Sequence, residues 1–409
     1  MYMINICAIR EKHINIIVLI FATFPLIPNA IKGFPVILLF IAILLSNIKK
    51  QTNWKWLLIN SSLYLIYLFS LIYTQNFKIA FTKLETSLSI LIIPIIFNGF
   101  LSQYNLDQKT RINFFKFFIF TTFCFSTISL FFIVLDNNTV YYLNWYTDKF
   151  RSLIIEVPLI GQHPIYASIF LSLSVIFFIE LIKKKSIKKN HQYVYLLFVI
   201  TNILLLLMLV SKGVIIGLLL VCFVDILQNL KNIKLTIIII LAAISFVVLN
   251  RRVKEVFNIE MYSHINENFS TSIRVGIYEC AFKVIGEKWV LGYGIGDSQR
   301  ALNLCYSNKS NILLKNRFNS HNQYLDVIIK TGLLGFIIFI YFLVANFKKA
   351  YDNKNRIVFN IIFFYCLIFL IENVLVRQSG VILFFFLLIF LNHTSEIVEI
   401  EKNEETKSY

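Results

Sequence analysis

The chain has 409 residues, of which 58% are hydrophobic and only 15% are charged, whereas an average soluble domain carries about 25% charged residues. The mean hydropathy of +0.73 excludes an ordinary soluble protein and indicates a polytopic membrane protein. The net charge of +17 lies in short clusters between apolar runs rather than along one amphipathic face. Nucleic-acid binding is therefore not expected.

Apolar runs near twenty residues predict an all-α fold with about twelve transmembrane helices, and we treat residues 1–409 as a single membrane domain. The first run follows Arg10 and Lys12, as in a signal peptide, but Pro25 and Pro28 precede a poor cleavage site. It is therefore predicted to be an uncleaved helix. The predicted helices cover residues 14–31, 33–48, 56–74, 84–101, 112–135, 164–182, 193–210, 214–230, 234–250, 324–346, 356–375 and 377–392.

Lysines and arginines gather on alternate connections, which predicts the orientation of the chain by the positive-inside rule. The connections assigned to the cytoplasm lie at residues 49–55, 109–111, 183–189, 231–234 and 348–356. Both termini are then cytoplasmic, and the acidic segment 393–409 is predicted to be a disordered cytoplasmic tail. The two long polar segments, 136–163 and 251–323, are predicted to be outer loops.

The second outer loop is predicted to contain more than irregular chain. Apolar residues recur at helical spacing from Ile273 to Trp289, with Thr271 or Ser272 placed to cap the start of a helix. An amphipathic helix of this kind would lie on the membrane surface or roof the bundle. The glycine-rich segment 291–297 follows, and we interpret it as a tight turn that brings backbone near the site. No βαβ unit surrounds it, so it is a weak nucleotide-binding signal.

The six cysteines include no CxxC pair and show no metal-binding spacing. Cys280 and Cys305 fall in the same outer loop and could pair in an oxidising compartment, which the sequence leaves open. The histidines predicted to face outward are His163, His264 and His321. Their spacing does not support a zinc site, so no metal and no cofactor is expected.

His321 lies where the polar loop gives way to an apolar helix, within Asn319–Asp326. Considered alone, it is an interfacial histidine bonded to neighbouring backbone or a general base. Imidazole titrates near pH 6.5, so it is largely neutral at physiological pH and able to accept a proton.

Three cations are predicted to reach the outer interface, namely Lys212, Arg274 and Arg377, while Arg151 and Arg317 are less clearly placed. Each could simply anchor its helix by extending its charged end to water. Several cations converging at this depth would instead require an anionic partner. A lipid-linked diphosphate is the natural anion there, since arginine binds phosphate oxygens bidentately and lysine acts as a point charge.

Several of these stretches resemble the O-antigen ligase and polysaccharide polymerase family of bacterial envelope proteins. The resemblance covers roughly residues 150–390, whereas the first five predicted helices match only in hydropathy. The stretches that carry it are Gly161–Tyr166, Ser211–Gly213, Ile273–Arg274 with Gly292–Gly294, Ser320–Tyr324 and Glu372–Gly380.

The resemblance implies a C-type glycosyltransferase fold in the bacterial inner membrane, with a large periplasmic loop. It also implies metal-independent, inverting transfer of a glycan from undecaprenyl diphosphate. The family's loop histidine falls on His321, a catalytic base, and its diphosphate-facing arginine falls on Arg274. A basic residue that is often arginine falls on Lys212, and Arg377 is a third diphosphate-binding candidate.

The expected partners are the undecaprenyl diphosphate-linked glycan, membrane lipids and an acceptor. A ligase would use a lipid A core sugar as acceptor, and a polymerase of the same family would use another lipid-linked glycan. A polysaccharide-lipid transporter is a remote alternative, because no internal repeat is present and the acidic residues look juxtamembrane. These acidic residues are Glu85, Glu180, Asp225 and Glu372.

Overall fold

A computed structural model describes residues 11–46, 51–102, 106, 108–135, 148–228, 265 and 270–405. All regular secondary structure in these ranges is helical, which confirms the predicted all-α class. The predicted helix 234–250 and His264 lie outside the described residues.

Six helical stretches of the described chain are long and apolar enough to cross a membrane. They are Trp54–Ile72 (α3, Trp54–Phe69, with η3, Ser70–Ile72), Phe77–Phe100 (α4, Phe77–Ser87; α5, Ser89–Pro94; η4, Ile95–Phe100), α6 (Gln108–Leu135), α9 (Pro164–Lys183), α10 (Lys189–Leu209) and α17 (Gln323–Asp352). Further apolar helices pack among them, namely α1 (Glu11–Ile20) with η1 (Phe21–Leu26), η2 (Asn29–Ile31), α2 (Phe34–Leu44), α11 (Lys212–Gln228), α18 (Arg356–Phe369) and α19 (Gln378–Glu405). The architecture is that of a multi-pass membrane protein.

The two ends of this bundle differ in chemistry. At one end, Lys183 at the close of α9 pairs with Asp225 of α11, and Arg111 of α6 donates to Asn355 before α18 at 3.2 Å. We call this the lysine end, because the connections rich in lysine meet there. The connection between α9 and α10 and the connection between α17 and α18 both lie at this end, as predicted. Which side of the membrane they face stays a prediction.

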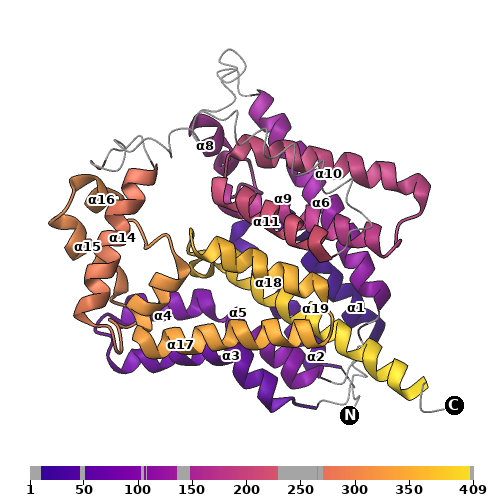
Figure 1. Ribbon diagram of the computed structural model, residues 1–409, viewed down its shortest axis with the longest axis horizontal. Coiled ribbons are helices and arrows are strands. Elements are labelled where there is room, and N and C mark those ends of the chain that lie inside the picture. Colours follow the sequence, from indigo (N-terminus) through magenta and orange to yellow (C-terminus); the bar gives the residue numbers. More distant parts are fainter. Residues whose placement is uncertain are drawn as a thin grey trace, which may run out of the picture.

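At the opposite end, three helices form what we call the cap: α14 (Ser270–Glu287), α15 (Ser298–Ser307) and α16 (Asn311–Asn316). Figure 1 shows them together at the left, beyond the ends of α4 and α17. The predicted amphipathic helix is confirmed as α14, although it begins at Ser270, ahead of both predicted caps. Its buried stripe packs into a small core separate from that of the bundle. That core contains Ile277, Cys280, Ala281, Val284, Ala301, Leu302, Tyr306, Leu313, Leu325 and Ile329.

Cys280 and Cys305 form a disulfide between α14 and α15, with their Cα atoms 5.6 Å apart. The sequence left this pairing open, and the structure shows it. The bond fixes α14 against α15 close to the residues through which α14 contacts α17.

The predicted helix 324–346 is not continuous. Gly332 has φ 64°, which interrupts α17, and the backbone of the glycine-rich turn lies against the break. Tyr293 N–H donates to the carbonyl of Ile329 at 2.8 Å, and Leu333 N–H donates to that of Trp289 at 2.8 Å. A Cβ on Gly332 would lie 2.1 Å from the Val290 carbonyl oxygen, so only glycine fits. The turn therefore packs against α17 at the break itself, between Ile329 and Leu333.

Two further helix ends differ from the prediction. The helix predicted for 356–375 ends at Phe369, and residues 370–377 form a connecting loop with one short turn, η8 (Val374–Val376). The tail predicted to be disordered continues α19 as helix through Glu405, since it contains strong helix formers and neither proline nor glycine.

Candidate functional site

The turn that carries His321 is held in an uncommon backbone conformation. His321 has φ 43°, in the left-handed region that non-glycine residues rarely enter. Its N–H donates to Asn319 Oδ1 at 3.0 Å, and Tyr278 of α14 donates through its hydroxyl to the His321 carbonyl at 3.3 Å. Asn322 then caps α17, because its Oδ1 accepts the N–H of Tyr324 at 2.9 Å. The strained residue is thus fixed from both sides, as functional residues often are.

Glu372, in the loop after α18, brings two of the predicted site residues together. Its carboxylate oxygens lie 3.2 and 3.1 Å from His321 Nδ1. One of them lies 3.6 Å from a guanidinium nitrogen of Arg274 on α14. The Glu372 side chain is 10% exposed, while those of His321 and Arg274 are 23% and 35% exposed. His321 and Arg274 therefore reach solvent, whereas the Glu372 carboxylate that joins them is buried.

The electrostatics of the cluster follow from this arrangement. Burial by itself would raise the pKa of Glu372. The hydrogen bond from His321 and the positive charge of Arg274 act in the opposite direction, so the pKa lies below its ordinary value and the group is a carboxylate. A carboxylate only accepts hydrogen bonds, so His321 Nδ1 carries the proton in this contact and Nε2 is left with a free lone pair when the ring is neutral.

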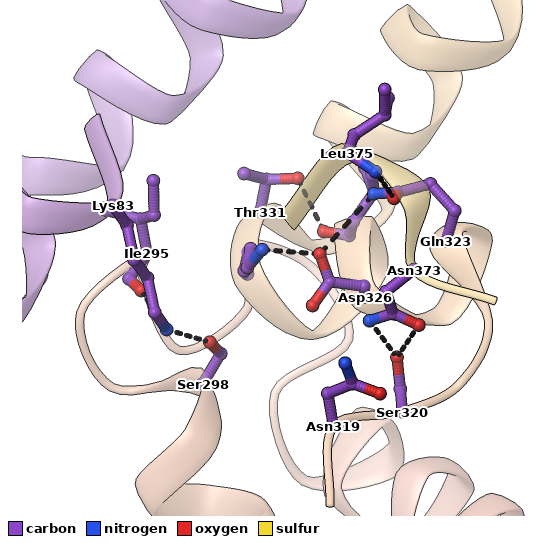
Figure 2. Close-up of polar contacts among 12 residues, drawn as sticks. Lys83, Ile295, Ser298, Asn319, Ser320, Gln323, Asp326, Thr331, Asn373 and Leu375 are labelled. Carbon is purple, nitrogen blue, oxygen red and sulfur yellow. Dashed lines mark hydrogen bonds and ion pairs between the residues drawn. The ribbon is translucent and has the colours of Figure 1, made fainter. Parts of the chain in front are cut away.

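The loop 370–377 is held in place by buried polar side chains of the α17 segment (Figure 2). Gln323 Oε1 accepts the N–H of Leu375 at 2.8 Å, and Asn373 donates to Ser320 Oγ at 3.0 Å. Gln323 also contacts Asp326, which pairs with Lys330 at 2.5 Å. These contacts flank Glu372 and fix its position relative to His321.

Arg377, the third predicted cation, lies beside a different partner. Its guanidinium sits 5.9 Å from the ring centroid of Tyr166, whose hydroxyl donates to the Val374 carbonyl at 3.1 Å. The neighbouring His163 immediately precedes α9. Burial, and next the charge of Arg377, lower the pKa of His163 to about 4, so this imidazole is neutral at physiological pH. The charge of Glu372 acts in the opposite direction, which places this carboxylate at the same end of the bundle.

The remaining basic candidates lie around this cluster or outside it. Lys212 is in the first turn of α11, and the next residue, Gly213, packs so closely on Ile371 that a Cβ would lie 1.5 Å from its Cδ1. Lys212 therefore adjoins the loop that carries Glu372. Arg151 of α8 (Asp148–Glu156) donates to the carbonyls of Leu209 and Val210 and supports the turn before α11. Arg317 ends α16 within the cap and is exposed.

Glu372 is the residue whose role the sequence did not indicate. From the sequence, Glu372 is one of the juxtamembrane acidic residues and falls inside the helix predicted for residues 356–375. A signal was available, because Glu372 and Asn373 interrupt an apolar run within one of the stretches of family resemblance. Asn373 and Gln323 also support the site, through hydrogen bonds, but their side chains do not titrate and so did not mark them as candidates.

The arrangement joins an imidazole, a carboxylate that orients it and an arginine at the surface of the cluster. That combination suits proton transfer beside a group that gains negative charge. Among the residues that the structure describes, no three His, Cys, Asp or Glu side chains are grouped as metal ligands.

Fold and site together define a multi-pass membrane protein with a histidine–glutamate–arginine cluster at the cap end of its helices. Comparison with protein families adds a similarity: residues 196–340 match the family described as O-antigen ligase, which confirms the resemblance over this segment. The similarity covers this segment alone and does not separate a ligase from a polymerase. It includes Lys212, Arg274 and His321 and ends before Glu372 and Arg377. Among curated proteins, no sequence matches the chain.

Proposed function

We propose that this protein is an O-antigen ligase-type glycosyltransferase of the bacterial inner membrane. It moves a glycan from undecaprenyl diphosphate to a hydroxyl of a lipid A core sugar at the periplasmic face. The observation that supports the proposal most directly is the contact of His321 Nδ1 with the Glu372 carboxylate, with Arg274 on the same carboxylate.

His321 is the general base of the proposed reaction. Glu372 keeps the proton on Nδ1, so Nε2 accepts the proton of the acceptor hydroxyl as its oxygen attacks the anomeric carbon. The new bond joins that oxygen to the carbon, and the bond from the carbon to the phosphate oxygen breaks. The electron pair leaves with undecaprenyl diphosphate, and attack from the opposite face inverts the anomeric centre. Glu372 stabilises the imidazolium that forms.

Arg274 binds the departing diphosphate, which gains negative charge as the bond breaks. At 35% exposed, its guanidinium is within reach of a bound substrate while it contacts Glu372 from one side only. Lys212 and Arg377 supply further positive charge near the same loop. Both substrates are anchored in the membrane, so the end of the bundle brings them together at a fixed depth.

The base is tested by His321→Ala in purified protein. Transfer is expected to fall by about 10²- to 10⁴-fold, the usual span for removal of a general base, with binding of the lipid donor retained. His191→Ala is the matched control, because His191 is an exposed histidine at the lysine end. Transfer within a few-fold of wild type in His321→Ala would return this histidine to a structural role.

Binding of the diphosphate by Arg274 is tested by Arg274→Lys and Arg274→Ala. Bidentate binding requires the guanidinium fork, so the lysine variant should be nearly as impaired as the alanine variant. Arg317→Lys is the control outside the cluster. Full activity in Arg274→Lys would remove bidentate binding, and full activity in Arg274→Ala would remove Arg274 from the site.

The acceptor is tested in a deletion strain by the profile of its lipopolysaccharide and lipid-linked glycans. Loss of a ligase leaves unsubstituted lipid A core and accumulated lipid-linked polymer. Core that carries one repeat unit would instead identify a polymerase.

A further inference from the structure

A cavity lies where the cap meets the start of α4, and its lining does not include His321. Its volume is about 210 Å³, and it is lined by Tyr73, Gln75, Lys288, Tyr293, Asp297 and Arg300, among others. The lining comes from the connection between η3 and α4, from the glycine-rich turn and from the start of α15. The proposed transfer reaction uses none of these residues.

Buried contacts hold the walls of this cavity in place. Asp297 Oδ2 accepts the N–H of Gln75 at 2.6 Å and that of Asn76 at 3.3 Å, which joins the turn to the start of α4. Lys83 of α4 donates to the Ile295 carbonyl at 2.9 Å and to Ser298 Oγ at 3.2 Å (Figure 2). The cavity is therefore preformed rather than a gap between mobile loops.

Asp297 is the most informative residue of the lining. It is 8% exposed, and its second oxygen, Oδ1, is buried without a hydrogen-bond partner among the described residues. A buried carboxylate oxygen without a donor is unfavourable. A ligand that donates a hydroxyl at this wall would relieve that cost.

The other side chains define a ligand of mixed character. Lys288 Nζ lies 4.8 Å from the ring centroid of Tyr293, and the Tyr293 hydroxyl donates to Glu287 at 2.5 Å, so this ring is held in one orientation. Tyr73 is the second aromatic side chain. Lys288 and Arg300 are the two cations, both exposed. Such a lining offers ring faces for an apolar surface, positive charge for an anion and a carboxylate for hydroxyl donors.

We infer that this cavity binds an acidic sugar of the transferred glycan, one whose carboxylate faces Lys288 and Arg300 and whose hydroxyls face Asp297. This inference rests on the proposed function. A fully ionised anion such as sulfate offers no hydrogen-bond donor to Asp297 Oδ1, and a neutral sugar offers no negative charge to the two cations. The volume lies below the roughly 300–1,000 Å³ of sites for drug-sized ligands, so it suits a single sugar ring.

The position of the cavity agrees with a role in holding the glycan. Lys288 directly follows the last residue of α14 and lies fourteen residues after Arg274, and at about 1.5 Å per residue this is roughly 20 Å. A glycan whose diphosphate lies at Arg274 would reach the cavity with a sugar some distance from the reacting bond. The cavity would thus select the donor by its composition without entering the chemistry.

Binding of defined probes to the full-length protein in lipid nanodiscs tests the inference. Trigalacturonic acid is expected to bind, and maltotriose, a neutral trisaccharide, to bind at least about tenfold more weakly. Arg300→Gln should weaken the binding of trigalacturonic acid by about tenfold, the effect of losing one hydrogen bond to a charged group. Lys315→Gln removes the same charge from an exposed position of the cap outside the cavity and should have no effect.

Several results would overturn the inference. Equal binding of the two trisaccharides would do so, as would competition by millimolar inorganic phosphate, which would reveal a plain anion site. Unchanged binding in both Arg300→Gln and Lys288→Gln, with melting temperatures as in wild type, would place the ligand elsewhere. His321→Ala separates the two proposals, because it should abolish transfer and leave trigalacturonic acid binding intact.

Discussion

Replacement of Glu372 by glutamine tests how the cluster works as a unit. The carboxylate contacts His321 Nδ1 at 3.1 Å and Arg274 at 3.6 Å, and at 10% exposed it is little screened by water. The amide of Glu372→Gln keeps the shape and loses the charge. It can also donate to Nδ1, which favours the imidazole tautomer that carries the proton on Nε2 and cannot act as base.

The size of the effect follows from the contact that is lost. A hydrogen bond to a charged group contributes about 1.5–3 kcal/mol, and each 1.36 kcal/mol changes a rate about tenfold. Transfer by Glu372→Gln is therefore expected to fall roughly 10- to 150-fold. Most of the loss should appear in kcat, because the imidazolium that Glu372 stabilises forms during the reaction.

The assay is single-turnover transfer by purified protein, with undecaprenyl diphosphate-linked glycan as donor, lipid A core as acceptor and the product measured by mass spectrometry. Glu279→Gln is the matched control, because this glutamate lies on α14, is 56% exposed and pairs with Lys309 at the surface. Surface pairs contribute about 0–1 kcal/mol, so its activity should stay near wild type. Activity of Glu372→Gln within twofold of wild type, at an unchanged melting temperature, would refute the proposed orientation of His321.

Three other predictions concern stability and orientation. Loss of the Cys280–Cys305 disulfide, which closes a loop of 25 residues, should destabilise the cap by about 3.5 kcal/mol; limited proteolysis of the cap should accelerate with dithiothreitol, and an unchanged rate would count against this role. The pKa of His163 is lowered to about 4, while an unfolded histidine titrates near 6.5, so the unfolded state binds a proton that the folded state excludes. Melting temperature should therefore fall as pH drops from about 6.5 towards 4, less steeply in His163→Gln, and parallel curves would contradict this. In spheroplasts, Ser307→Cys should react with an impermeant maleimide and Ser186→Cys should not; the reverse pattern would invert the predicted orientation.

Hydropathy located most of the described helices because length and apolar content are the main requirements of a membrane span. The stripe of α14 was also predictable, since Ile277, Ala281 and Val284 recur at helical spacing and one face must be buried. His321 is indicated by the resemblance and by its place where the polar loop meets an apolar helix, and Arg274 by the resemblance and by its predicted place at the outer interface. The structure brings both onto one carboxylate.

The helix interruptions and Glu372 could not be predicted in this way. Val374, Leu375 and Val376 are as apolar as a membrane helix, yet they lie in a loop, where Val374 and Leu375 are buried against protein. Hydropathy does not distinguish these two surroundings. The contact between Glu372 and His321 joins residues 51 positions apart, and the break at Gly332 depends on a turn from another segment. Such long-range contacts leave no local periodicity.

The separate core of the cap affects how members of such a family can diverge. Only Leu325 and Ile329 of α17 enter that core, and every other residue in it belongs to the cap itself. Substitutions that reshape the outer surface of α15 or α16 are therefore absorbed within the cap and do not shift the transmembrane helices. His321 remains in the turn before α17, in contact with Glu372 of the loop after α18. Selection for a different glycan can thus act on the outer surface of α15 and α16 while His321, Glu372 and, on α14, Arg274 stay constant.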